Sequence, residues 1–109
     1  MTPEQDFDTL AATFAGDLDV SLPADGQGFG SGTFRHRGKI FAMLRRGHLV
    51  VKLPSTRVDS LVASGDGARF DRNQGRPMRE WLVLDPDSAL DWAAIAREAL
   101  TFVSSNAVR

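Results

Sequence analysis

The chain has 109 residues, the size of one domain, so we expect a single domain over residues 1–109 with an ordered core at about 3–103. It contains no cysteine, which excludes disulfides, thiolate metal sites and cysteine nucleophiles. The formal net charge of -1 excludes a protein whose whole surface is basic.

The charges are distributed unevenly along the chain. Residues 1–25 hold six acids and no Lys or Arg, whereas residues 26–58 hold seven bases and no acid. Three of the N-terminal acids, Glu4, Asp6 and Asp8, stand where a secretory signal carries bases, and no apolar run is long enough to cross a bilayer. We therefore expect a cytoplasmic protein with a basic central segment and no membrane contact.

The first predicted element is an N-terminal helix. Thr2 and Pro3 suit a helix start, and Gly16 suits its end. An apolar stripe at helical spacing, which must pack on a core, is formed by Phe7, Leu10, Ala11 and Phe14. The acidic, turn-rich segment 17–27 is predicted to be a loop.

Three β-like runs follow at 29–35, 40–44 and 49–53, separated by Gly-containing turns, and they predict an antiparallel meander. Both alternating sets of side chains in 40–44 are apolar, so this strand is predicted to lie centrally in the sheet. Gly26–Gly32 is glycine-rich and precedes a strand, whereas a phosphate-binding loop precedes a helix. We therefore expect an edge strand there.

The second half predicts a helix, a strand pair and a final helix. Pro54 ends the third strand, and Ser55 is predicted to cap a short helix that buries Val58, Leu61 and Val62. Strands at 68–71 and 79–84 flank a turn at 73–77. The final helix starts at Ser88–Asp91, and residues 104–109 are predicted to fray. Its buried stripe is predicted to consist of Trp92, Ile95, Ala96, Ala99, Phe102 and Val103.

These elements predict an α+β fold with the order α-β-β-β-α-β-β-α, in which a five-stranded, mainly antiparallel sheet packs against helices in two layers. Large aromatic and sulfur-containing side chains dominate cores, so Met78, Trp81 and Trp92 are predicted to be buried. In that arrangement Trp81 and Val83 point towards the helices.

Several of the motifs resemble a known family. They are Gly28–Gly32 on the first strand, Gly38–Leu44 on the second, Leu49–Leu53 on the third, Gly75–Val83 on the late strand pair, and Trp92 with Ala96 and Ala99. Together they resemble the TfoX N-terminal domain and the related MmcQ/YjbR domain over about Gly28 to Val103. The resemblance implies an α-β3-α-β2-α domain with a regulatory role, and MmcQ/YjbR proteins are described as DNA-binding on structural analogy.

The resemblance implies no catalytic residue set, and the chain departs from it in two ways. TfoX proteins carry a further C-terminal helical domain, whereas this sequence stops after the first domain. MmcQ/YjbR proteins often place a base or His just before the late-strand tryptophan, where this chain has Glu80.

The basic segment supplies the candidate binding residues, because guanidinium groups at hairpin tips can contact phosphates. Ordinary solvated turns have the same composition, so that alternative stays open. The two predicted tips lie at opposite ends of the second strand, about 15 to 20 Å apart at ~3.3 Å per residue. The predicted nucleic-acid-binding residues are Arg35, Arg37, Lys39, Arg45, Arg46 and Lys52.

Other site chemistries find little support. His36 and His48 fall in different turns without a nearby carboxylate, so we expect no metal, and no serine-nucleophile motif is present. We expect no cofactor and no enzymatic activity. The sequence predicts a non-enzymatic regulatory domain with weak, salt-sensitive nucleic-acid binding. The alternative is a protein-interaction or homodimerisation module with no nucleic-acid role.

Overall fold

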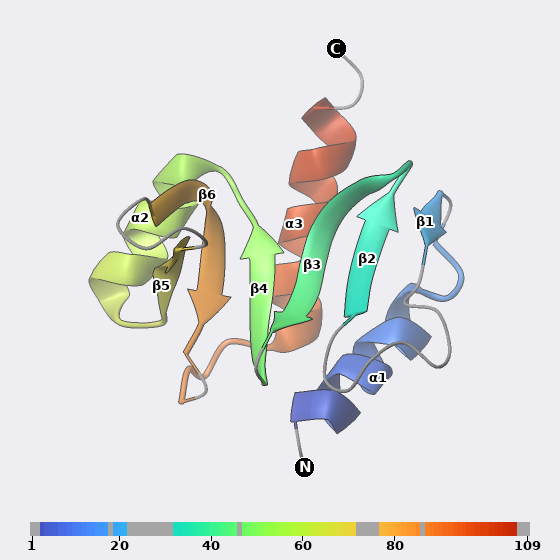
Figure 1. The fold of residues 1–109 in the computed structure, drawn as a ribbon, viewed down its shortest axis with the longest axis horizontal. Coiled ribbons are helices and arrows are strands. Elements are labelled where there is room, and N and C mark those ends of the chain that lie inside the picture. Colours follow the sequence, from blue (N-terminus) through green and yellow to red (C-terminus); the bar gives the residue numbers. More distant parts are fainter. Residues whose placement is uncertain are drawn as a thin grey trace.

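A computed structural model describes residues 3–17, 19–21, 32–45, 47–71, 77–85 and 87–106 (Figure 1). The helices are α1 (Pro3–Phe14), α2 (Ser55–Ser64) and α3 (Trp92–Asn106). The strands are β1 (Val20–Ser21), β2 (Gly32–His36), β3 (Lys39–Arg45), β4 (His48–Lys52), β5 (Gly67–Asp71) and β6 (Pro77–Leu84). In these ranges no helix is both long enough and apolar enough to cross a membrane.

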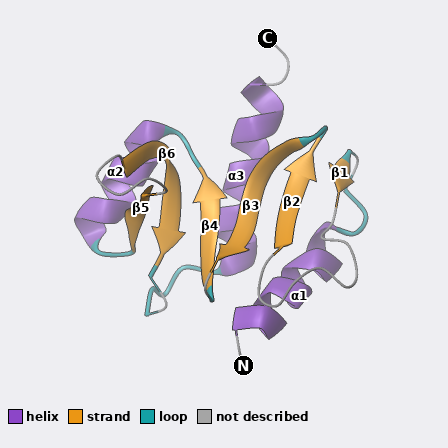
Figure 2. Cartoon of the chain, viewed as in Figure 1, coloured by secondary structure: helices purple, strands orange, loops and turns teal. Residues whose placement is uncertain are grey.

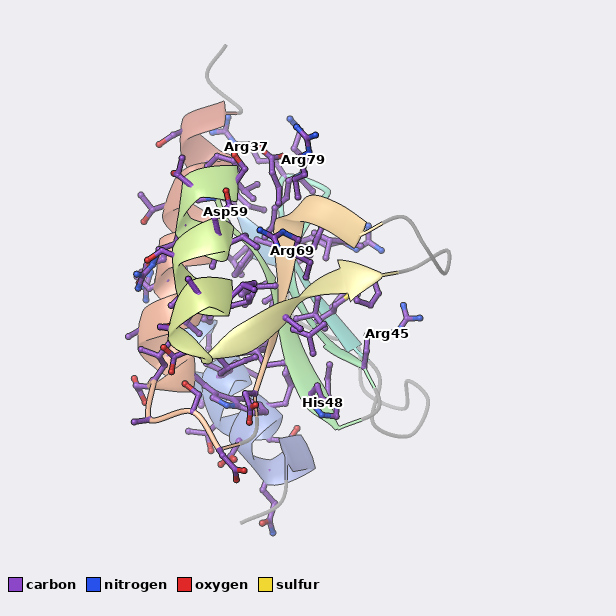
Figure 3. The ribbon with its side chains drawn as sticks, turned by 90° about the vertical axis from the view of Figure 1, so that its left-hand side faces the viewer. Arg37, Arg45, His48, Asp59, Arg69 and Arg79 are labelled. Carbon is purple, nitrogen blue, oxygen red and sulfur yellow. The ribbon has the colours of Figure 1, made fainter. Side chains whose placement is uncertain are left out.

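The strands form one antiparallel sheet in the order β1-β2-β3-β4-β6-β5 (Figure 2). Figure 3, turned by a quarter, shows the three helices along one side of the sheet and none along the other. The predicted two-layer α+β class and the central position of the 40–44 strand are therefore confirmed.

The sheet has one strand more than the five predicted. Val20 and Ser21, predicted to be loop, form β1, which pairs with His36 and Arg35 at the end of β2. A two-residue strand is too short to show alternation in the sequence. β1 pairs only with Arg35 and His36, so Gly32 has no β1 residue beside it and the expectation of an edge strand is not contradicted there; 26–31 lie outside the described residues.

A β-bulge decides which side chains of β3 enter the core. Phe34 pairs with Ala42, but the next residue of β2 pairs with Ile40, so Phe41 is the extra residue. Phe41 and Ala42 are both fully buried and both belong to the core cluster. The bulge thus turns two adjacent side chains of one strand towards the helices.

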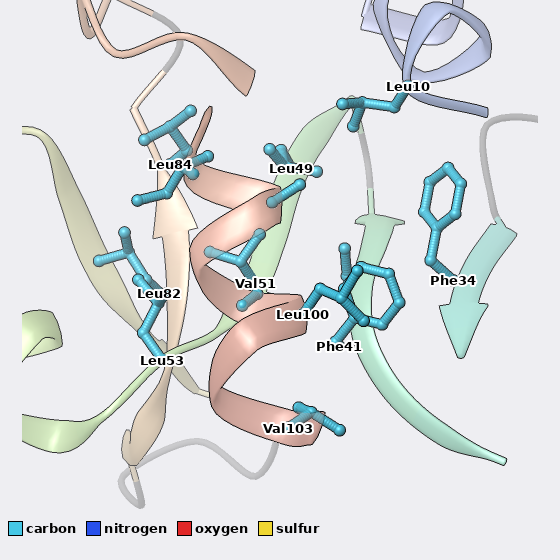
Figure 4. Close-up of a cluster of buried hydrophobic side chains, with 14 of the residues drawn as sticks. Leu10, Phe34, Phe41, Leu49, Val51, Leu53, Leu82, Leu84, Leu100 and Val103 are labelled. Atoms are coloured by element: carbon cyan, nitrogen blue, oxygen red, sulfur yellow. The ribbon is translucent and has the colours of Figure 1, made fainter. Parts of the chain in front are cut away.

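The core lies between the sheet and the helices (Figure 4). The predicted stripe of α1 is confirmed, because Phe7, Leu10 and Phe14 are buried and Ala11 packs against them. Phe34 contacts two rings of α1, with centroids 4.8 Å from Phe7 and 5.7 Å from Phe14. Edge and tilted ring contacts of this kind add to the area that the aromatic side chains bury.

The helix ends differ in part from the predictions. Asp91 caps α3, since its Oδ2 accepts a hydrogen bond of 3.1 Å from the N–H of Ala94. Gly65 ends α2 in the left-handed conformation, with φ of 84°. Ser55 is not a cap: α2 starts at Ser55 itself, Pro54 holds the cap position and no side chain caps the helix. The fraying predicted from residue 104 is wrong up to Asn106, because α3 continues that far.

The predicted orientation of Trp81 is also wrong. Leu82 pairs with Val51, and both are fully buried on the helix side, so Trp81 and Val83 point to the opposite side. Trp81 is half-buried there. Trp92 is half-buried and packs against the core cluster, and the side chain of Met78 lies outside the described residues.

Candidate functional site on the helix-free face of the sheet

The helix-free face is built by the side chains that alternate with the core residues of each strand. Pairing register assigns one set of described residues to this face: Thr33, Arg35, Ile40, Met43, Arg45, His48, Val50, Lys52, Ala68, Trp81 and Val83. Phe70 joins them through its contact with Arg45. Every charged residue that the register gives to this face is a base, and no carboxylate is among them.

The structure gathers only part of the predicted basic set on this face. Arg35, Arg45 and Lys52 lie on it. Arg37 does not, because it sits in the β2–β3 turn with φ of 51° and its Nε donates to Asp19 Oδ2 at 3.0 Å. Lys39 pairs with His36, and the register places it on the helix-bearing side. Arg46 lies outside the described residues.

The bases on the face also occupy both ends of it. Arg35 pairs with Ile40 near one end of β3, and Arg45 forms the other end, about 16 Å away at ~3.3 Å per residue. β4 begins at His48, which pairs with Arg45, and ends at Lys52. Lys52 therefore lies at the end of the face that is far from Arg45. The expectation that the two tips lie at opposite ends of β3 is therefore confirmed, and the basic residues form a band along the face rather than one compact patch.

Ion pairing separates the bases of the molecule into two groups. Four arginines pair with carboxylates: Arg37 with Asp19, Arg57 with Glu98, Arg69 with Asp59, and Arg97 with Asp17. Figure 3 shows Asp59 and Arg69 close to one another and Arg45 projecting on the side away from the helices. Five bases have no carboxylate partner within the described part of the chain: Arg35, Lys39, Arg45, Lys52 and Arg79.

The end of β5 departs from regular pairing and reaches over the face. A register shift between Arg69 and Phe70 breaks the regular pairing with β6. Phe70 then reaches Arg45, whose Cζ lies 5.7 Å from the ring centroid, although β6 and β4 separate β5 from β3 in the sheet. Val50, which points to this side, is fully buried. The face is therefore curved and has an aromatic–cation contact over its middle strands.

A shallow groove of about 540 Å³ opens at the other end of the face. It is lined by Lys52, Ser55, Arg79, Glu80 and Trp81. Lys52 Nζ lies 5.6 Å from the centroid of the Trp81 ring, a second aromatic–cation contact. The first turn of α2 has neither an acid nor a side-chain cap, so its free N–H groups leave a positive potential beside Ser55.

Sequence reasoning missed Arg79, Trp81 and Phe70 as parts of the site. Trp81 is predicted to be in the core because large aromatic side chains dominate cores, but both alternating sets of β6, Trp81 with Val83 and Leu82 with Leu84, are apolar, so alternation does not select a face. A signal was nevertheless present, since Lys52 between Val51 and Leu53 fixes which face of β4 is solvated. Because Lys52 pairs with Trp81, the side chain of Trp81 points to the same solvated face of the sheet.

The two histidines stay apart. His36 pairs with Lys39 at one end of β3, and His48 pairs with Arg45 at the other end. The Nδ1 atom of His36 is buried without a hydrogen-bond partner in the structure. Among the described side chains no group of three His, Asp or Glu residues is arranged to hold a metal ion.

Comparisons with known proteins add no relative: no family model matches the chain, and neither a curated protein nor a solved structure does so. The candidate site therefore depends on its own geometry and charge.

Proposed function

We propose that this protein is a non-enzymatic, regulatory nucleic-acid-binding domain of TfoX N-terminal or YjbR-like type, and that the helix-free face of its sheet is the contact surface. The observation that carries the proposal is the division of the bases. The four arginines that pair with carboxylates all lie off the helix-free face, whereas Arg35, Arg45 and Lys52 on that face have no such partner among the described residues. Lys39, on the helix-bearing side, also has no carboxylate partner there. An unneutralised band of bases attracts phosphates.

The aromatic contacts support the same function. Nucleic-acid-binding sheets combine cations for the backbone with exposed aromatic rings for the bases. Here each end of the face carries such a combination, Arg45 with Phe70 and Lys52 with Trp81. Asp59 and Glu98 are on the helix layer, whereas Glu80 lines the groove at the Lys52–Trp81 end. The pairing register gives no carboxylate to the rest of the face within the described ranges, which suits contact with a polyanion.

Charge removal on the face tests the proposal. In the double variant Arg45→Gln with Lys52→Gln, the affinity for a short labelled oligonucleotide, measured by fluorescence anisotropy, is expected to fall about 10-fold or more at low salt. The slope of log affinity against log salt is expected to fall by about 2, because two phosphate contacts are lost. Single-stranded and duplex forms of the oligonucleotide are both measured.

The matched control removes the same charge from the helix side. Arg57→Gln with Arg69→Gln breaks two exposed ion pairs, which contribute little to stability, and is expected to leave the affinity nearly unchanged. If both double variants lost the same affinity for the oligonucleotide, only net charge would matter. That result would contradict the helix-free face as the contact surface. A chain that binds neither oligonucleotide form but sediments as a stable dimer would favour a protein-interaction module instead.

A further inference from the structure

Resting on the proposed function, we infer that the nucleic acid held by the helix-free face is single-stranded RNA, and that the groove at Trp81 takes one unpaired nucleotide of it. The groove brings together three kinds of residue that can bind a ribonucleotide. They are an aromatic residue, two basic residues, and residues whose side-chain oxygen atoms can hydrogen-bond a sugar hydroxyl. Each kind has a separate chemical reason.

The aromatic ring selects an unpaired base. Trp81 is half-buried on a face without helices, and it lines the groove. In a duplex the faces of the bases are stacked inside and only the edges and the backbone are reachable. An indole that is only half-buried in this way gains stacking energy from single strands, whose nucleobases are free to turn outward.

The basic residues position the phosphate backbone of the nucleic acid. Lys52 and Arg79 line the same groove as Trp81, and neither has a carboxylate partner in the described ranges. With Lys52 Nζ 5.6 Å from the indole centroid, a base stacked on Trp81 carries its phosphate beside the ammonium group. The Arg45–Phe70 contact repeats the combination elsewhere on the face, which suits an extended strand better than one isolated nucleotide.

The oxygen atoms select ribose. Glu80 is among the residues that line a groove otherwise rich in cations, and its negative charge repels phosphate there. A carboxylate in this position is favourable when it accepts a hydrogen bond from a sugar hydroxyl, as acidic residues do from the ribose of bound nucleotides. Ser55 lines the same groove, and a serine hydroxyl offers both a donor and an acceptor. The 2′-hydroxyl, which DNA lacks, can donate a hydrogen bond to the carboxylate of Glu80 and can exchange one with the hydroxyl of Ser55.

A second groove gives the contrast. It is lined by Pro54, Arg57, Ala94, Arg97, Glu98, Thr101, Phe102 and Ser105. There Arg57 pairs with Glu98 through two hydrogen bonds, and Arg97 pairs with Asp17. The bases of that groove are neutralised by the protein, so it offers no comparable site for phosphate.

Anisotropy with matched oligonucleotides tests the inference on the full chain. The probes are labelled oligouridylate, oligodeoxyuridylate of equal length, and oligouridylate paired with oligoadenylate, with uridine monophosphate as a competitor. Oligouridylate is expected to bind about 10-fold more tightly than the duplex, because only the single strand stacks on Trp81. It is also expected to bind more tightly than the deoxy strand, and the mononucleotide is expected to compete only at much higher concentration.

Variants separate the three groups. Trp81→Ala is expected to weaken oligouridylate about 10-fold, within the range of one lost base stack, while the duplex affinity stays within about twofold. Trp81→Phe keeps a ring and is expected to recover most of the affinity. Glu80→Gln removes a negative charge and so raises the affinity for both strands, but the ratio of ribo to deoxy affinity falls. Arg57→Gln is the control and leaves all values unchanged.

The outcomes distinguish this inference from the proposed function. Salt-dependent binding that favours the duplex, or that Trp81→Ala leaves unchanged, overturns the single-stranded assignment while the nucleic-acid function stands. Equal affinities for the ribo and deoxy strands overturn the assignment to RNA, and a mononucleotide that competes as well as the strand overturns the assignment to a polymer. Failure of every oligonucleotide to bind overturns both proposals.

Discussion

The side chain of Phe41 points into the core because of a β-bulge, and not because of the regular alternation of side chains along β3. The bulge at Phe34–Arg35 makes it the extra residue of β3, and it is fully buried beside Ala42. Its ring centroid lies 5.6 Å from that of Phe14 and 6.0 Å from that of Phe34. One side chain of the sheet thus joins α1 and β2 in the same aromatic cluster.

Truncating this ring is expected to be costly. Phe41→Ala should lower the free energy of unfolding by about 3 to 5 kcal/mol, because it removes a fully buried ring and leaves a cavity between two layers. Urea unfolding followed by circular dichroism measures the loss. Met43→Ala, on the half-buried helix-free side of the same strand, should cost clearly less. Equal costs for the two variants would contradict the assignment of Phe41 to the core by the bulge.

At the scale of elements, the contact between β5 and β6 depends on a glycine. A Cβ atom added at Gly67 would lie 2.6 Å from the carbonyl oxygen of Val83 and 2.8 Å from Leu82 Cδ1. Both neighbours belong to β6, and Leu82 is fully buried, so neither has room to move. The start of β5 can approach β6 closely only without a side chain.

Gly67→Ala is therefore expected to destabilise the protein by about 1 to 3 kcal/mol, the usual cost of overpacking. Gly16→Ala is the matched control, since a Cβ there meets nothing within 4 Å, and it should be neutral or slightly stabilising. The midpoint of urea unfolding compares the two. A neutral Gly67→Ala would show that the strands separate easily at this point.

Most elements could be predicted from the sequence, because apolar periodicity determines helices and strands directly. The stripe of α1 and the buried residues of α3 illustrate this. What could not be predicted is pairing: β1 is too short to show alternation, and the face of Trp81 depends on its partner Lys52 across the sheet. The candidate site was found in part, since Arg35, Arg45 and Lys52 were named, whereas Phe70 enters through a register shift in β5 that composition does not reveal.

At the scale of the whole molecule, Asp66 joins two distant connections. The hydroxyls of Ser64 and Ser88 donate to its carboxylate at 2.6 and 2.8 Å, and its carbonyl oxygen accepts from the N–H of Asp85 at 2.8 Å. The turn after α2 is thereby fastened to the segment between β6 and α3. The hydrogen bonds, from Ser64 first and then from Ser88, hold the pKa of Asp66 below its ordinary value of 3.8.

This clamp makes the stability of the molecule depend on pH. Because the folded pKa is the lower one, the contribution of Asp66 is fully present above the unfolded value of 3.8 and is lost as pH falls through the folded pKa. Asp66→Asn should therefore be less stable than the parent chain at neutral pH, and the difference should shrink in acid. Urea unfolding at a series of pH values measures it.

A second variant checks the cause. Ser88→Ala removes one of the two donors, so its difference from the parent chain should also shrink in acid but start smaller. A constant difference between Asp66→Asn and the parent at every pH would mean that the carboxylate is not held by these hydroxyls.

Lys52 stands between Val51 and Leu53, both fully buried, so each outward side chain of β4 is flanked by inward ones that anchor the backbone. Replacing Lys52 therefore removes no fully buried side chain, unlike replacing Val50, which also points outward but is fully buried. The solvated side chains of the helix-free face can therefore be varied while the packing between the sheet and the helices keeps the other side folded.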